Sequence, residues 1–262
     1  MMLATSTYYY MPLKKKNDAE IIRAIQNLIE KNGPIGYISM SKLLKPEFGI
    51  GKKRTYRLMK ENGLLCKKAR KHLVKTTDSD HSLPKYENLL KGVTITGINQ
   101  AIVGDVTQFS IRGKNAYLAM LMDLFNREIV GFAVSHTNDT SLVVNCLNCM
   151  FEKRGSHIGC IHHTDADSRY CSKAYTELLK NAGILISMVC GSVYENAHAE
   201  SLNKTVKYKQ INLNEYDSLS EAEEQIAKYI KFYNEEKPHS ALKWLSPIIY
   251  AECFGSKNFN KK

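Results

Sequence analysis

Three consecutive stretches rich in β-branched and aromatic residues constrain the fold of this chain more than any other feature. They cover residues 102–111, 116–125 and 129–134, and only a few residues separate each stretch from the next. β-Branched and aromatic side chains favour strands, and connections this short join antiparallel neighbours. The sequence therefore predicts a three-strand meander.

Helices and further strands alternate after the meander. The first helix carries Val143, Leu147, Met150 and Phe151 at helical spacing. The later segments, in chain order, are predicted as strand 158–162, helix 172–182, strand 184–188, helix 196–209 and a last helix that opens with a capping box at Ser220-Glu221-Ala222-Glu223. A meander followed by β–α units implies an α/β fold, with a mixed five-stranded sheet flanked by helices.

The positive charge of the chain is confined to its first third. Residues 1–75 hold 17 lysines and arginines against 5 acidic residues, whereas residues 76–262 hold 20 against 21. A merely solvated lysine-rich surface would not explain why the remainder is close to neutral. The asymmetry indicates a module that binds a polyanion, and it favours nucleic acid as the partner.

The basic part is predicted to be a small all-α domain of the helix-turn-helix type. A helix begins at Asn17 or Asp18, and residues 33–36 break the chain. A second helix, 39–44, stops before Pro46, and a third, 52–62, ends at Gly63. The third helix is expected to contact DNA through its basic side chains Lys52, Lys53, Arg54, Arg57 and Lys60. The expected boundaries are 1–75 for this domain, 76–98 for a polar linker, 99–252 for a catalytic core and 253–262 for a tail.

Composition excludes several other classes of protein. No apolar run approaches the roughly 20 residues of a membrane span, and the N-terminus lacks the pattern of a secretory signal. The seven cysteines are dispersed and odd in number, which favours reduced thiols in a cytoplasmic protein. Cys146 and Cys149 have a zinc-like spacing without a second pair, so no zinc site is expected.

Three acidic residues occupy unusual positions. Asp105 lies in the middle of the first strand, Asp165 just past the fourth strand, and Glu200 in the helix after the fifth strand. If the fourth strand pairs beside the first, two carboxylates meet at one edge and the helix adds the third. Such a cluster favours hard Mg²⁺ or Mn²⁺, and two ions about 4 Å apart could act on a phosphodiester. The alternative is two solvated acids and one hydrogen-bonded strand aspartate.

At these acids the chain resembles the insertion-sequence transposases whose second reading frame encodes a retroviral-integrase-type core. The resemblance covers nearly the whole length and depends on the order and spacing of many short motifs. In the core they are Asp105-Val106-Thr107, Tyr117-Leu118-Ala119, Asp123, residues 127–131, His163-Thr164-Asp165, Tyr170, Ser187-Met188, Glu195-Asn196-Ala197, Ala199-Glu200-Ser201, Tyr233-Asn234, Pro238-His239 and Pro247. Residues 6–10 and 57–64 are similar to the N-terminal helical segment of the same family.

The resemblance implies a ribonuclease-H-like core in which Asp105, Asp165 and Glu200 form a DDE triad that holds two Mg²⁺ or Mn²⁺ ions. It implies cleavage and joining of double-stranded DNA at the inverted repeats of a mobile element and at a target, by an oligomer associated with the prokaryotic nucleoid. An upstream-frame protein or fusion is a further expected partner. The chain departs from the family at three positions: Ile102 stands where Trp is usual, Asp167 where Gly is usual, and Glu195 where Asp is usual. Loop 189–191 is one residue shorter than in the family.

Two further residues of the helix after the fifth strand are candidate DNA contacts. Lys207 follows Glu200 by two helical turns and Asn196 precedes it by one, so both share its face. The resemblance implies that a lysine here touches DNA near the reacting end. The alternative for both residues is a solvated helix surface. Asp123, near a hairpin turn, is interpreted as structural, and His163 either supports Asp165 or fills the core.

Two other functions are compatible with these features. A metal-dependent nuclease of the same fold would cut DNA without joining it. A non-catalytic DNA-binding regulator would keep the basic domain and lose one acid of the triad, and the sequence retains all three. The triad and the extent of the resemblance favour the transposase.

Overall fold

The computed structural model describes residues 18–66, 81–155, 157–189 and 197–255. The chain divides into two compact units, Met1–Cys66 and Lys67–Lys262.

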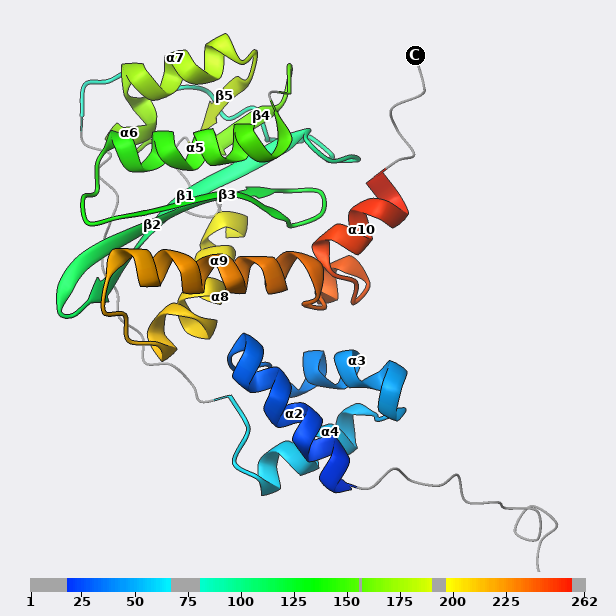
Figure 1. The fold of residues 1–262 in the computed structure, drawn as a ribbon. Coiled ribbons are helices and arrows are strands. Elements are labelled where there is room, and N and C mark those ends of the chain that lie inside the picture. Colours follow the sequence, from blue (N-terminus) through cyan, green and yellow to red (C-terminus); the bar gives the residue numbers. More distant parts are fainter. Residues whose placement is uncertain (1–17, 67–80, 156, 190–196, 256–262) are drawn as a thin grey trace, which may run out of the picture. The chain divides into compact units, whose positions relative to one another are not determined.

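Residues 18–66, the described part of the first unit, contain three helices, α2 (Asp18–Asn32), α3 (Tyr37–Phe48) and α4 (Lys52–Glu61), shown in blue to cyan in Figure 1. Helix α3 continues through Pro46, so the prediction that it stops before this proline is wrong. Proline in the last turn removes one backbone donor, and the helix ends instead at Gly49, whose φ of 60° is left-handed and whose N–H donates to the Lys45 carbonyl.

Residues 49–51 form a tight turn between α3 and α4. The prediction that Gly63 terminates the next helix is confirmed, because its φ is 67° and the N–H of Leu64 donates to the Met59 carbonyl at 2.8 Å. Thr55, Leu58 and Met59 form the buried side of α4. The result is a helix–turn–helix whose last helix exposes basic side chains.

The second unit is built on a five-stranded sheet with the order β3-β2-β1-β4-β5. The strands are β1 (Ala101–Ile111), β2 (Lys114–Asp123), β3 (Ile129–Ser135), β4 (Ile161–Thr164) and β5 (Leu185–Met188). Strand β2 pairs antiparallel with β1 and with β3, β4 pairs parallel with β1, and β5 pairs parallel with β4. The predicted meander and the mixed sheet are confirmed.

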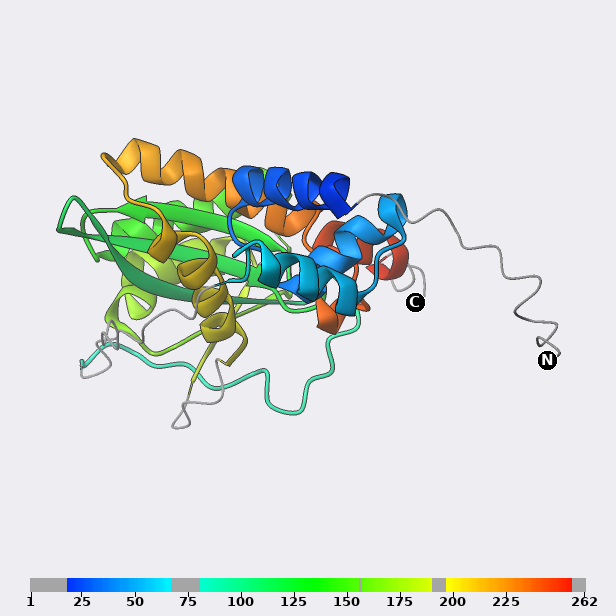
Figure 2. The ribbon, with the colours of Figure 1, turned by 90° about the horizontal axis from the view of Figure 1, so that it is seen from below.

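Helices cover both faces of this sheet (Figure 1). One face packs against α5 (Thr140–Arg154), α6 (Ser168–Cys171) and α7 (Lys173–Asn181). The other face packs against α8 (Ala197–Lys209) and α9 (Leu219–Glu235), with α8 running in front of the strands in Figure 2. The remaining elements are the short turns η2 (Ile211–Leu213) and η3 (Ser240–Leu242) and the helix α10 (Pro247–Phe254).

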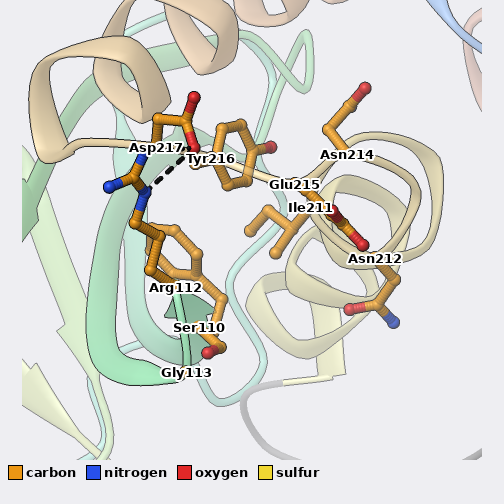
Figure 3. Close-up of a pocket in the computed structure, with 10 residues that line it drawn as sticks. Ser110, Arg112, Gly113, Ile211, Asn212, Asn214, Glu215, Tyr216 and Asp217 are labelled. Atoms are coloured by element: carbon orange, nitrogen blue, oxygen red, sulfur yellow. Dashed lines mark hydrogen bonds and ion pairs between the residues drawn. The ribbon is translucent and has the colours of Figure 1, made fainter.

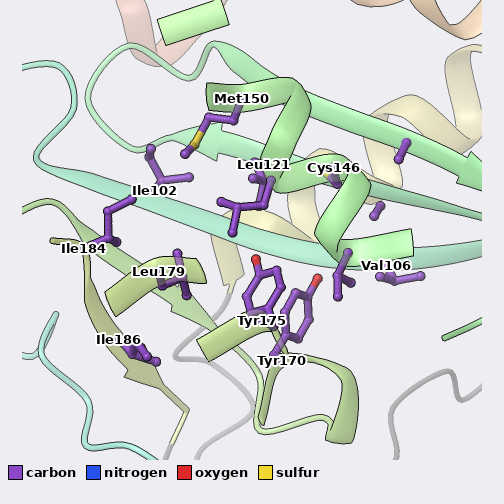
Figure 4. Packing of buried hydrophobic residues seen from close by; sticks show 14 of the residues in the cluster. Ile102, Val106, Leu121, Cys146, Met150, Tyr170, Tyr175, Leu179, Ile184 and Ile186 are labelled. Carbon is purple, nitrogen blue, oxygen red and sulfur yellow. The ribbon is translucent and has the colours of Figure 1, made fainter. Parts of the chain in front are cut away.

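The main hydrophobic core lies between the sheet and the helices α5, α6 and α7 (Figure 4). Ile102 of β1 is buried in this core, so the position where the family usually has Trp is filled by a smaller apolar side chain. Gly131 permits the close contact of β3 with α5, because a Cβ there would lie 2.5 Å from the Cys146 carbonyl oxygen.

Two predicted boundaries differ from the structure, which also contains one further short helix. Strand β4 begins at Ile161 and not at 158, since Gly159 turns the chain with a φ of 81°. The helix predicted at 172–182 is α7, with Ser172 and Ala182 as its caps, and the Ser172 hydroxyl accepts from the Tyr175 N–H; the short helix α6 directly before it was not predicted. The cap of α9 is Ser218 and not Ser220, because the Ser218 hydroxyl accepts from Glu221 N–H and the Glu221 carboxylate accepts from Asp217 N–H.

Residues 81–98, within the predicted linker, belong to the second unit and contact its sheet and the loop after β4. The Leu89 N–H donates to the Ser187 hydroxyl at 2.8 Å, and His81 Nε2 contacts the Ala166 carbonyl oxygen at 2.9 Å. The described part of this segment is therefore held beside β5 and beside the loop that follows β4.

Among the described residues, no helix is long and apolar enough to cross a membrane. Six of the seven cysteines lie in the described part of the chain and are free thiols, and Cys190 lies outside it. Burial raises the pKa of the Cys160 thiol to about 12.

Candidate active site

The parallel pairing of β1 with β4 brings Asp105 and Asp165 to the same height on neighbouring strands. Val103 lies opposite His163 in this register, and each aspartate follows two residues later. The expectation that the fourth strand pairs beside the first is confirmed. Two carboxylates 60 positions apart in the sequence are therefore neighbours at the centre of the sheet.

The carboxylate of Asp105 is held by two hydrogen bonds. Oδ1 accepts from the Val106 N–H at 2.8 Å, and Oδ2 accepts from Asn203 Nδ2 at 2.7 Å. Asn203 lies on the buried side of α8, next to Leu202 and Val206. Packing of that apolar side on the sheet thus brings the amide to the aspartate. Sequence reasoning missed Asn203, although its spacing of three residues from Glu200 places both near one face of the helix.

The pKa of Asp105 is shifted by burial and by neighbouring negative charge. Burial, together with the neighbouring Asp165 and more weakly Glu200, raises the pKa of Asp105 to about 7 against the opposing effect of its two hydrogen bonds. The three predicted acids therefore act on one another electrostatically. A cation bound between them would remove this repulsion.

Glu200 lies on α8, partly exposed, and its carboxylate pairs with Lys204 Nζ at 3.7 Å. Within the described ranges, no group of three His, Cys, Asp or Glu side chains is gathered closely enough to enclose a metal ion. The donor set nevertheless fits a hard divalent cation, because it consists of carboxylates and Asp105 carries the raised pKa of a repelled group.

The loop after β4 carries a buried ion pair beside Asp165. The Asp167 carboxylate accepts from the Arg169 backbone N–H at 3.0 Å and from its guanidinium, which also donates to Asn138. Asp167 has a φ of −77°, so the position does not require the glycine that the family usually has. The departure is accommodated by this pair with Arg169.

The two histidines of β4 point to opposite sides of the strand and are hydrogen-bonded inside the protein. His163 Nδ1 contacts the Ser187 hydroxyl at 2.8 Å, and His162 Nε2 contacts the Tyr175 hydroxyl at 2.7 Å. Burial lowers the pKa of His162 to about 3. His163 is thus a buried core residue that joins β4 to β5.

Asp123 has the structural role expected for it. Its buried carboxylate accepts from the backbone N–H groups of Asn99 and Phe125 at 2.7 and 2.8 Å and pairs with Arg154 at 2.9 Å. Arg154 also pairs with the buried Glu128. This network joins the start of β1, the end of β2 and the end of α5.

The five candidate DNA contacts of α4 fall into two groups. Arg54 and Arg57 both pair with Asp18 of α2, at 2.5 and 2.9 Å, and lower the pKa of its carboxyl. Arg57 pairs with Glu61 as well. Lys52, Lys53 and Lys60 are exposed. The lysines present their charge to solvent, whereas the arginines also join two helices.

Of the two candidate DNA contacts on and before α8, Asn196 and Lys207, the structure describes only Lys207. Asn196 lies outside the described residues. So do Glu195 and most of loop 189–191. Lys207 is half-buried, and burial lowers its pKa. Its placement beside DNA stays a prediction.

A hollow of about 500 Å³ opens away from the carboxylates, between the β1–β2 turn and residues 211–217 (Figure 3). Its one lining arginine, Arg112, pairs with Asp217 at 2.9 Å, as the dashed line shows. Glu215 also lines this hollow, so its lining carries no excess of positive charge.

Comparison with known proteins agrees with this fold. Two models described as integrase core domain match residues 96–191 and 185–247, and one described as an HTH-like domain matches residues 15–72. The chain belongs to the integrase-core transposases of insertion sequences, and its catalytic unit has the ribonuclease-H-like α/β fold.

Individual relatives cover most of the chain. The transposase for insertion sequence element IS904 of Lactococcus lactis is 32% identical over 90% of this chain and 95% of that protein. The putative transposase InsK for IS150 of Escherichia coli K12 is 29% identical over 93% and 87%. A chain of the simian T-cell lymphotropic virus intasome shares the fold, with a TM-score of 0.54 at 12% identity, over 94% of this chain and 77% of that one.

Proposed function

We propose that this transposase cleaves DNA at the ends of an insertion sequence and joins those ends to target DNA, with Asp105, Asp165 and Glu200 as its catalytic residues. The observation that carries the proposal is the β1–β4 register, which makes two carboxylates neighbours while α8 adds a third acid. The raised pKa of Asp105 supports a shared negative site.

These three carboxylates would hold two divalent ions, Mg²⁺ or Mn²⁺. When bound, such ions activate a hydroxyl nucleophile and stabilise the leaving oxygen of a phosphodiester. The residues of the chain keep the carboxylates in place: Asn203 and the Val106 N–H orient Asp105. The Asp167–Arg169 pair orders the loop that carries Asp165. Double-stranded DNA would be bound through the exposed lysines of α4, by an oligomer.

The experiment is a cleavage and strand-transfer assay on the purified full chain, with Mg²⁺ and a duplex that carries the terminal repeat of the element. Asp105→Asn, Asp165→Asn and Glu200→Gln should each reduce both reactions below detection, because each removes a charge at nearly constant side-chain size. Glu177→Gln, which changes an exposed acid of α7, is the matched control.

Circular dichroism should show that all four variants fold. Full activity in any one folded triad variant would remove that residue from the site. Cleavage without joining in the wild-type protein would identify a nuclease instead.

A further inference from the structure

A second hollow, of about 260 Å³, lies on the far side of α8 from Glu200. Its lining includes Arg127 from the β2–β3 turn, Lys237 and His239 from the segment after α9, and His198 and Ser201 of α8. We call it the Arg127–Lys237 hollow. His198 and Glu200 are two residues apart, about 200° around the helix, so the hollow and the triad flank the same helix.

The positive charge that lines the Arg127–Lys237 hollow comes from Arg127 and Lys237, because burial lowers the pKa of His198 and lowers that of His239 to about 3. Its other lining residues are Met122, Leu202, Thr205, Tyr233, Ser240 and Ala241, so no Asp or Glu is among the described residues that form it. This distinguishes it from the hollow near Arg112, where Asp217 neutralises the arginine. The Arg127–Lys237 hollow concentrates positive charge in a partly enclosed space.

The acid that acts on Arg127 does not neutralise this charge. Asp123 influences Arg127 electrostatically, but its carboxylate is already bound by two backbone N–H groups and by Arg154. Burial lowers the pKa of Lys237 and of His239, and basic neighbours lower it further, namely Lys209 for Lys237, and Lys237 and Arg127 for His239. A bound anion would relieve this repulsion.

The positions of the basic groups are fixed by packing. Lys237 Nζ lies 4.8 Å from the centre of the buried Tyr233 ring and 3.5 Å from His239 Nε2. The His239 ring stacks edge-on against Tyr233, with centroids 4.5 Å apart. Arg127 is placed by the turn between two core strands. The site is therefore ordered before an anion arrives, and Ser201 and Ser240 add hydroxyl donors to its lining.

We propose that the Arg127–Lys237 hollow binds a phosphate of the DNA backbone and so positions the strand across α8 from the triad. The inference rests on the proposed function, because DNA is the polyanion that this protein would bring to α8. The hollow would add a phosphate contact in the catalytic unit to those made by α4.

The test is acylation of lysines in the wild-type full chain by an amine-reactive ester, in EDTA, with and without a DNA duplex. Burial lowers the pKa of Lys237 to about 8, so more of it is the reactive amine. The duplex should slow acylation of Lys237 several-fold, and should leave Lys228 of α9, which is exposed and pairs with Glu224, nearly unchanged. The same acylation reaction with inorganic phosphate in place of the duplex distinguishes binding of free phosphate from binding of a DNA phosphate.

A second measurement uses the variant Lys237→Met, with Lys228→Met as its control. Removing one protein–phosphate interaction should lower the slope of log affinity against log salt by about 0.9 in the first variant, and the slope should be unchanged in the second. Protection of Lys237 together with this flatter slope supports the proposal. The proposal would be overturned if Lys237 stayed reactive in the DNA complex. It would also be overturned if inorganic phosphate protected Lys237 and the duplex did not.

Measurements of Lys237 reactivity and of DNA cleavage and joining on the wild-type protein test this inference and the proposed function separately. If the wild type cleaves and joins DNA while Lys237 stays reactive, only the hollow is wrongly assigned. If DNA protects Lys237 and Mg²⁺ supports no cleavage or joining, the proposed reaction fails and the phosphate site stands. A wild type that does not bind the duplex contradicts both.

Discussion

At the scale of single residues, Asp105 shows how a strand can hold a half-buried acid. Its two hydrogen bonds favour the charged form, and burial beside Asp165 disfavours it by more, so the pKa rises to about 7. The folded state without metal therefore binds a proton at Asp105 more tightly than the unfolded chain does. A group of this kind makes stability depend on pH and on cations.

The metal-free protein should lose stability as the pH rises from 3.8 to about 7, because the contribution of protonated Asp105 is complete below the ordinary pKa and is lost above the raised one. The loss should be on the order of 1–3 kcal/mol. Thermal unfolding in EDTA across this range measures it. Mg²⁺ should restore stability above this window, and Asp105→Asn should be nearly insensitive to both. Equal pH profiles of the two proteins would contradict the assignment.

Lys207 is the other residue whose role follows from its place on α8. Since it cannot ligate a metal, Lys207→Ala should leave Mg²⁺-dependent stabilisation unchanged. It should weaken binding of the element end most strongly at low salt, because a lost phosphate contact flattens the salt dependence of binding. The control is Lys228→Ala on α9, because Lys204 pairs with Glu200 and is not neutral toward the site. Wild-type joining at every salt concentration would show that Lys207 is a helix-surface residue.

At the scale of elements, the basic residues of α4 have two roles, DNA binding and contact with α2, and the sequence does not show which residue has which role. Its five basic residues all suit phosphate contact, yet Arg54 and Arg57 reach Asp18 on α2 and help to hold the three-helix unit together. Lys52, Lys53 and Lys60 are exposed and available to a polyanion. Charge that stabilises the fold and charge that binds DNA are thus distributed within one helix.

Two variants of α4 should therefore have different effects, one on DNA binding and the other on thermal stability. Replacing Lys52, Lys53 and Lys60 with Ala should lower the salt slope of DNA binding by about 0.9 for each phosphate that is no longer neutralised, and should leave thermal stability nearly unchanged. Arg54→Ala should lower stability by about 0.5–1 kcal/mol, since it removes a partly exposed ion pair. Titrations at several salt concentrations and thermal unfolding measure the two effects. An unchanged slope in the triple variant would place DNA elsewhere.

At the scale of the whole molecule, two units divide charge and chemistry. The positive excess lies in residues 1–75, while the carboxylates belong to the sheet and to α8. The arrangement suits a protein in which one unit supplies most of the affinity for DNA and the other acts on the bound strand. The Arg127–Lys237 hollow would add one local contact on the catalytic side.

Separating the units should test this division. Residues 67–262 alone should bind duplex DNA much more weakly than the full chain and with a flatter salt dependence, because the first unit neutralises most of the phosphates. The slope that remains should be small and should fall further with Lys237→Met. Affinity and slope equal to those of the full chain would show that the basic unit is not the main DNA-binding part.

The sequence by itself determined the kinds of elements and much of the site's composition. Strand and helix patterns, turn glycines and caps depend on residues close together in the chain, so the meander, the helix–turn–helix and the positions of the acids were predictable. Resemblance to a family then assigned Asp105, Asp165 and Glu200 to one site. Element ends were less predictable where competing caps lie within two residues, as at Ser218 and Ser220.

Only the tertiary structure decided which of these residues meet. The Asn203–Asp105 bond joins positions 98 apart, and the Arg54–Asp18 pair joins positions 36 apart. The strand register that aligns Asp105 with Asp165 and the grouping of Arg127, Lys237 and His198 are likewise long-range. Local preferences carry no information about such pairings, because they arise when apolar faces pack and bring distant polar groups together.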